Sequence, residues 1–131
     1  MNKPTHPVEL LCCAIATQEG FFAAGTVPAS RNNPGDLDFA GQLGMTRPPA
    51  GSPDPEIGVC DSPQRGIVKL FRQVWEYVDM KFTVREIVQS WAPVAAGNDT
   101  STYLANVLEW TGLPADTPVL ELLPPLIKLN G

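Results

Sequence analysis

The chain has 131 residues, of which 44% are hydrophobic and 18% are charged, a balance typical of folded globular domains and not of disordered chains. That length suffices for one hydrophobic core, so residues 1–131 are expected to form a single domain. The formal net charge of −5, with no cluster of lysine or arginine, excludes the basic surface that binding of nucleic acid requires.

The first predicted element is a helix from Pro7 or Val8 to about Glu19. Proline suits the first helical position, and apolar residues at helical spacing form a stripe from Val8 to Ile15. Glu19 stands four residues after Ile15, so it extends from the buried face of the helix, at the mouth of the core. Gly20 then suits the left-handed conformation that ends many helices.

Glycine and proline are frequent between residues 20 and 66, which predicts loops and short strands in place of long helices. Two short segments, Leu43–Thr46 and Ile57–Cys60, are expected to be extended. They are predicted to pair as a small antiparallel hairpin.

The rest of the chain carries the signals of four more helices, because capping residues and prolines precede apolar faces at helical spacing. These helices are residues 63–78 after Asp61 or Ser62, residues 83–91 with a Thr83–Glu86 capping box, residues 99–112 after Asp99 or Thr100, and a last segment from Thr117–Pro118 that Pro124 and Pro125 interrupt. About five helices around a glycine- and proline-rich middle predict a mainly α fold (α+β), with a small β-hairpin or an irregular middle segment.

Few residues here support the common catalytic chemistries. The only histidine, His6, lies near the N-terminus, which disfavours serine–histidine and cysteine–histidine nucleophile systems. A single histidine and the lack of a Cys-x-x-Cys pattern argue against a zinc site, and no glycine-rich phosphate-binding motif is present. Cys12, Cys13 and Cys60 are expected to be free thiols made in a reducing compartment. Carboxylate chemistry remains, without metal or cofactor, and it suits the cleavage of a glycosidic bond.

Glu19 has the setting that best suits a carboxylic acid catalyst. Burial raises the pKa of a carboxyl group, and the negative end of a helix dipole raises it further. An apolar stripe precedes Glu19, and Phe21 and Phe22 follow it, as expected for an acid in a hydrophobic pocket. The alternative interpretation is a solvated glutamate at the end of a helix.

Four motifs in the same order resemble the lysozyme-like and lytic-transglycosylase domains associated with phages. Those domains typically read Ala-Ile-Ala-x-x-Glu-Gly, then Arg-Asn-Asn-Asn-Pro-Gly-Asn-Leu, then Gly-Ile-x-x-Leu, and finally Trp/Tyr-Ala-Pro followed by Asn-Asp-Thr and Tyr. The similar segments of this chain are Ala14–Phe22, Arg31–Leu37, Gly66–Leu70, Trp91–Pro93 and Asn98–Tyr103. The resemblance runs from about Val8 to Gly112, which is most of the chain.

On this resemblance, Glu19 matches the catalytic glutamate of the family. The resemblance also implies two groups of substrate-binding residues: Asn33, Pro34 and Gly35 on a turn that lines the cleft, and Asn98, Asp99, Thr100 and Tyr103 on the opposite wall. The structural alternative is a tight turn for residues 33–35, a helix cap for residues 98–100 and a core aromatic residue for Tyr103. The three tryptophans, Trp75, Trp91 and Trp110, are expected to pack in the protein more than to stack on sugars.

Two aspartates depart from the family pattern. Asp36 stands where the family usually has asparagine, and Asp38 where a basic residue is frequent. Either one would raise the pKa of Glu19 if it lay close to it, and either could be the base or stabiliser of a mechanism with two carboxylates. With neither nearby, a single glutamate acts as in lytic transglycosylases, where the 6-hydroxyl of the sugar attacks. The catalytic candidates are therefore Glu19, Asp36 and Asp38.

The resemblance implies a peptidoglycan-cleaving glycosidase, a lytic transglycosylase or muramidase, that cuts between N-acetylmuramic acid and N-acetylglucosamine. No signal peptide pattern is visible, and the apolar stretch Val8–Ala16 is too short to span a membrane. We therefore expect synthesis in the cytoplasm, no membrane insertion, and delivery to the cell wall by a virion, a lysis pore or a secretion machine.

Two other functions remain open. The first is a structural or wall-binding component of a phage particle or secretion apparatus that keeps the lysozyme-like fold with little activity, which the acidic charge also suits. The second is a helical domain that binds a small molecule or a protein partner and whose motifs match by chance.

Overall fold

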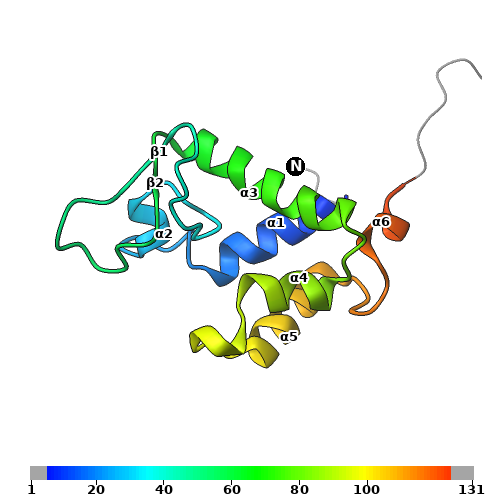
Figure 1. Cartoon of the computed structure of the whole chain (residues 1–131). Coiled ribbons are helices and arrows are strands. Elements are labelled where there is room, and N and C mark those ends of the chain that lie inside the picture. The colour runs from blue at the N-terminus through cyan, green and yellow to red at the C-terminus, as the bar shows by residue number, and fades with distance from the viewer. Residues whose placement is uncertain (1–5, 125–131) are drawn as a thin grey trace, which may run out of the picture.

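Helices dominate the protein in the computed structural model, which describes residues 6–124 (Figure 1). The predicted mainly α fold with a small antiparallel sheet is confirmed. The longer helices are α1 (Pro7–Gln18), α3 (Pro63–Asp79), α4 (Val84–Trp91) and α5 (Thr100–Thr111). The shorter elements are the helices α2 (Val27–Ser30) and α6 (Val119–Leu122), the 3-10 helix η1 (Val94–Ala96), and the strands β1 (Met45–Thr46) and β2 (Val59–Cys60).

The long helices begin where side chains near in sequence cap them. Ser62 accepts a hydrogen bond from the backbone at the start of α3, and Asp99 does so for α5. Thr83 and Glu86 form both bonds of the predicted capping box of α4. Gly112 ends α5 with a φ of 70°, in the left-handed region that glycine occupies without strain. These boundaries agree with the prediction because their signals are local.

The middle of the chain is more irregular than predicted. The strands are two residues long each, and Met45 pairs with Cys60 while Thr46 pairs with Val59. An isolated bridge between Asp38 and Ile57 adds a backbone contact between the segments that precede β1 and β2. Helix α2 was not predicted, because four residues are too few to show a helical period.

The hydrophobic core lies among the long helices. Helix α1 packs against both α3 and α5, and α4 packs against α5, so α1 lies at the centre of the helical part (Figure 1). Fully buried core side chains from these helices include Leu11, Ile15, Val74, Ile87 and Val107. Figure 1 shows that β1, β2, α2 and their loops gather at one end of the molecule, where α1 ends and α3 begins. We call this region, residues 20–62, the β-lobe.

A buried arginine holds the β-lobe together. Arg31 is 6% exposed, and its guanidinium donates hydrogen bonds to the backbone carbonyls of Pro53, Asp54 and Ile57. The backbone of Arg31 also accepts a bond from the amide of Cys60, at 2.9 Å. Because arginine carries several donors in a fixed plane, one side chain anchors the loop between β1 and β2.

Cys12, Cys13 and Cys60 are free thiols, and two of them, Cys12 and Cys60, are buried. Within residues 6–124, no helix has both the length and the apolar composition needed to cross a bilayer.

Candidate active site

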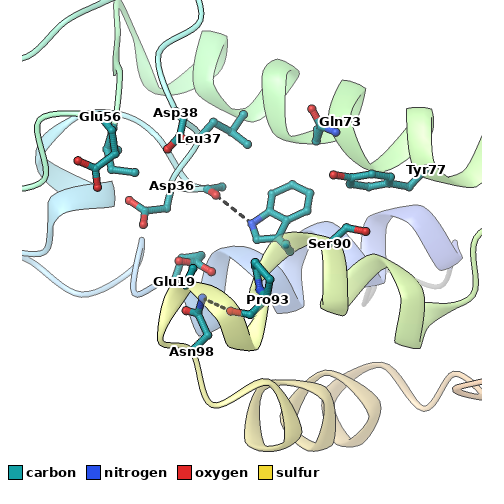
Figure 2. Close-up of a pocket in the computed structure, with 14 residues that line it drawn as sticks. Glu19, Asp36, Leu37, Asp38, Glu56, Gln73, Tyr77, Ser90, Pro93 and Asn98 are labelled. Atoms are coloured by element: carbon teal, nitrogen blue, oxygen red, sulfur yellow. Dashed lines mark hydrogen bonds between the residues drawn. The ribbon is translucent and has the colours of Figure 1, made fainter.

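An open cleft of about 480 Å³ lies between the β-lobe and the helices (Figure 2). This volume is within the range of pockets that bind small ligands. The residues that line the cleft come from the end of α1, the β-lobe, α3, and the region from α4 to α5: Glu19, Gly35, Asp36, Leu37, Asp38, Glu56, Ile57, Gln73, Tyr77, Ser90, Trp91, Pro93, Ala96 and Asn98.

Glu19 lies at the C-terminal end of α1, where its backbone amide still bonds to Ile15. The pKa of its carboxyl group is raised from 4.5 to about 7: burial raises it most, the hydrogen bond from Tyr103 lowers it, and the nearby charge of Asp36 raises it. Glu19 therefore combines a cleft position with a proton that is retained near neutral pH, which is what a general acid requires.

Phe21 and Phe22 do not line the cleft. They contribute instead to an apolar hollow between α1 and α3, together with Cys13 and Ile67, and Phe22 is 70% exposed. The cleft surface beside Glu19 is therefore formed by residues other than these two phenylalanines.

Tyr103 holds the carboxyl group of Glu19 from the side of α5. Its hydroxyl donates a hydrogen bond of 2.8 Å to Oε2 of Glu19. Tyr103 is 6% exposed, and burial, followed by the charge of Glu19, raises the pKa of its phenol. The hydroxyl therefore keeps its proton. The other carboxyl oxygen of Glu19, Oε1, has no hydrogen-bond partner within residues 6–124. Tyr103 touches the candidate acid but does not line the cleft.

The predicted turn at residues 33–35 supports the cleft more than it lines it. Asn33 is fully buried; its Oδ1 accepts from the amide of Leu37, and its Nδ2 donates to the carbonyls of Leu37 and Gly58, each at 2.9 Å. Pro34 is also fully buried. The expectation that these two side chains line the cleft is therefore wrong, because both lie beneath its surface, and the structural alternative of a tight turn describes them.

Gly35 is the residue of this turn that reaches the cleft. Its carbonyl accepts a bond of 3.0 Å from Nε1 of Trp91 (Figure 2). A Cβ atom on Gly35 would lie 2.9 Å from the Trp91 ring, so the glycine permits this close approach. Trp91 packs as predicted and also lines the cleft.

Of the second group of predicted substrate-binding residues, Asn98, Asp99, Thr100 and Tyr103, only Asn98 lines the cleft. Its Nδ2 donates to the carbonyl of Pro93 at 3.0 Å. Asp99 is exposed and caps α5 through the backbone and hydroxyl of Thr102. Thr100 donates from its hydroxyl to the carbonyl of Ala92. The structure thus places Asp99 and Thr100 outside the lining, where both stabilise the start of α5.

Both candidate partner carboxylates, Asp36 and Asp38, line the cleft. Asp36 has a φ of 53°, a left-handed conformation that aspartate tolerates better than most residues. Burial raises the pKa of Asp36, and the charges of Asp54, Asp38 and Glu56 act in the same direction, while Arg31 opposes them. Asp36 is thus the carboxylate that contributes directly to the raised pKa of Glu19.

Several cleft residues were not predicted from the sequence. Gln73 and Tyr77 are four residues apart on α3 and share one face of it, a spacing that could have indicated them. Glu56 has no such signal, because it reaches the cleft only through the pairing of Asp38 with Ile57.

The cleft is strongly acidic. Its lining contains four carboxylates and no lysine, arginine or histidine; the four are Glu19, Asp36, Asp38 and Glu56. Within the described part of the chain, no group of three or more histidine, cysteine, aspartate or glutamate side chains is arranged to hold a metal ion.

No family model, curated protein or solved structure matches this chain.

Proposed function

We propose that this protein is a peptidoglycan-cleaving glycosidase in which Glu19 is the general acid and base. The observation that carries the proposal is a half-buried glutamate on an open cleft, with a pKa of about 7 and one oxygen bonded by Tyr103. A protonated carboxyl group in that position can give its proton to the leaving oxygen of a glycosidic bond. The motifs that resemble lytic transglycosylases give the choice of peptidoglycan as the substrate.

The reaction begins with transfer of the Glu19 proton to the glycosidic oxygen, as the bond to the anomeric carbon breaks. The resulting carboxylate then accepts a proton from the attacking group. In transglycosylation that group is the 6-hydroxyl of the same sugar; in hydrolysis it is a water molecule. Asp36 and Asp38 both lie in the cleft lining, so either is a candidate to stabilise the positive charge that develops on the sugar.

The test compares the wild type with Glu19→Gln on isolated peptidoglycan, with soluble products analysed by mass spectrometry. Glu109→Gln is a matched control, because Glu109 is exposed on α5 and does not line the cleft. We expect Glu19→Gln to lower the rate by about 10²-fold or more, since it removes the transferable proton, and Glu109→Gln to retain it. Anhydro-muramyl ends would indicate transglycosylation, and reducing ends would indicate hydrolysis.

Release of no product by the wild type above the Glu19→Gln level, across a range of salt and pH, would contradict the proposal. It would favour the alternative of a structural or wall-binding protein. In an active enzyme, the rate should fall as the pH rises above about 7, because Glu19 then loses the proton that it must donate.

A further inference from the structure

The part of the cleft that α3 and α4 form is lined by uncharged side chains. These are Gln73 and Tyr77 from α3, and Ser90 and Trp91 from α4. Figure 2 shows Gln73, Tyr77 and Ser90 together at one end of the cleft, away from the four labelled carboxylates. We call these four uncharged residues the neutral end.

The two aromatic rings of the neutral end are held in place by their neighbours. Tyr77 stacks on Phe82, with ring centroids 5.2 Å apart and an angle of 13° between the planes. It also meets Trp91 edge to face at 6.3 Å, and Nε1 of Trp91 is fixed by the carbonyl of Gly35. Phe82 does not line the cleft, so it supports Tyr77 from behind. Rigid rings of this kind offer contact area at a low cost in conformational entropy.

The polar groups of the neutral end have hydrogen-bonding capacity to spare. In the described part of the chain, no hydrogen bond engages the side-chain amide of Gln73 or the hydroxyls of Tyr77 and Ser90. The amide has two donors and an acceptor, and each hydroxyl both donates and accepts. Since none of these groups is charged, an ion bound here would lose water without gaining an opposite charge.

Fixed aromatic rings beside free amide and hydroxyl groups suit a pyranose ring with neutral substituents. The C–H face of the sugar packs on an aromatic ring, while its hydroxyl and acetamido groups bond to the polar side chains at the edge. Of the two sugars that alternate in a peptidoglycan strand, N-acetylglucosamine is uncharged. N-acetylmuramic acid also carries a lactyl group, which ends in a carboxylate or a stem peptide. The neutral end therefore suits N-acetylglucosamine better.

We propose that the neutral end is a subsite for the N-acetylglucosamine units of the glycan, in which Tyr77 stacks on the sugar ring and Gln73 binds its acetamido group. The inference rests on the proposed glycosidase function, because it names the sugar that the same cleft takes. Tyr77 and Gln73 act here in binding and not in proton transfer. In an active enzyme, their loss should therefore raise KM more than it lowers kcat.

The experiment measures binding of tri-N-acetylglucosamine by calorimetry, in the Glu19→Gln background so that the trimer is not cleaved. We expect Tyr77→Ala to weaken binding about tenfold and Gln73→Ala about threefold, the sizes of one aromatic contact and one neutral hydrogen bond. Trp110→Ala is the matched control, because Trp110 is 47% exposed on α5 and does not line the cleft. It should retain the affinity.

Cellotriose tests the role assigned to Gln73, because it has the same linkage between its rings but hydroxyls in place of the acetamido groups. We expect it to bind Glu19→Gln about threefold more weakly than tri-N-acetylglucosamine does. Gln73→Ala should remove that difference. Equal binding of the two trimers to Glu19→Gln, or no binding of either, would overturn the inference.

A second pair of variants keeps the test independent of folding. Tyr77→Phe preserves the stacking on Phe82 and should keep most of the affinity, whereas Tyr77→Ala removes it, and thermal unfolding shows whether that variant is folded. If it is not, Gln73→Ala decides, because that side chain has no hydrogen-bond partner in the described residues to lose. Unchanged affinity in a folded Tyr77→Ala, or in Gln73→Ala, would overturn the inference.

Cleavage of isolated peptidoglycan separates this inference from the proposed function. If the wild type releases no product, but Tyr77→Ala and Gln73→Ala weaken binding of the trimer as expected, the subsite holds while the glycosidase function fails. If the wild type cleaves the glycan, and both variants keep its KM and the affinity for the trimer, the subsite is wrong while the glycosidase function stands.

Discussion

At Glu19, three neighbouring influences act on one carboxyl group in opposite directions. Burial and the charge of Asp36 favour the protonated form, whereas the bond from Tyr103 favours the carboxylate. Burial has the largest effect, so the pKa rises to about 7. The charged form of Glu19 is thus unfavourable in the folded protein, as expected where a group serves chemistry more than stability.

This raised pKa makes a prediction that does not depend on activity. In the unfolded chain the carboxyl ionises near its ordinary pKa of 4.5, and in the folded protein near 7. The folded state therefore binds more protons between these values, so stability is lost as the pH rises through this window and the full cost is present above it. Glutamine avoids the cost and can still accept the bond from Tyr103.

We therefore expect Glu19→Gln to raise the free energy of unfolding by roughly 1–3 kcal/mol at about pH 8, and to change it little at about pH 4. Urea unfolding at both pH values measures the difference. The control Glu109→Gln should show no such pH dependence. A variant that is less stable than the wild type at high pH would mean that the Glu19 carboxylate is well solvated or paired.

Among the elements, the first turn of α3 and the segment before Gly35 depend on each other. A Cβ atom at Gly66 would lie 1.8 Å from the carbonyl oxygen of Asn32 and 2.9 Å from the ring of Pro34. Backbone cannot yield as a flexible side chain can. Gly66 therefore allows α3 to pack directly on the turn that positions Gly35 and Asp36.

We expect Gly66→Ala to destabilise the protein by about 3 kcal/mol or more, although alanine is normally the better helix former by about 1 kcal/mol. Thermal and urea unfolding measure this change. Val68→Ala is the matched control, because Val68 is 59% exposed on the same helix and should cost less than about 1 kcal/mol. Equal stability of Gly66→Ala and the wild type would show that the turn can move away from α3.

For the whole molecule, the cleft exists because two parts of different construction meet. The helical part is held by an apolar core centred on α1. The β-lobe has short strands and depends on buried polar contacts, above all those of Arg31 and Asn33. Glu19 belongs to the helical part, whereas Asp36, Asp38 and Glu56 belong to the β-lobe.

Arg31→Met should therefore weaken the β-lobe selectively. It leaves the carbonyls of Pro53, Asp54 and Ile57 without their donor, which we expect to cost about 2–4 kcal/mol. Hydrogen–deuterium exchange should quicken in residues 48–57 before it does in α5, because the core of the helices is untouched. Arg72→Met, an exposed change on α3, is the control. Uniform exchange across both parts would mean that they unfold as one unit.

The long helices and the place of Glu19 follow from signals that are local in the sequence. Their caps lie within about four residues of the groups that they satisfy, so Ser62, Thr83 and Asp99 could be assigned locally. The apolar stripe of α1 likewise placed Glu19 at the edge of the core, and the prolines and glycines after it predicted an irregular lobe.

Which residues form the cleft depends on how distant segments of the chain pack together. The bond from Tyr103 to Glu19 joins residues 84 positions apart, and that from Trp91 to Gly35 joins residues 56 apart. No local pattern encodes such contacts, because they depend on how α1, α4 and α5 pack. For the same reason the sequence could not show that Asn33 is buried beneath the cleft or that Glu56 lines it: a motif gives the identity of a residue, whereas packing decides which side chains reach the surface.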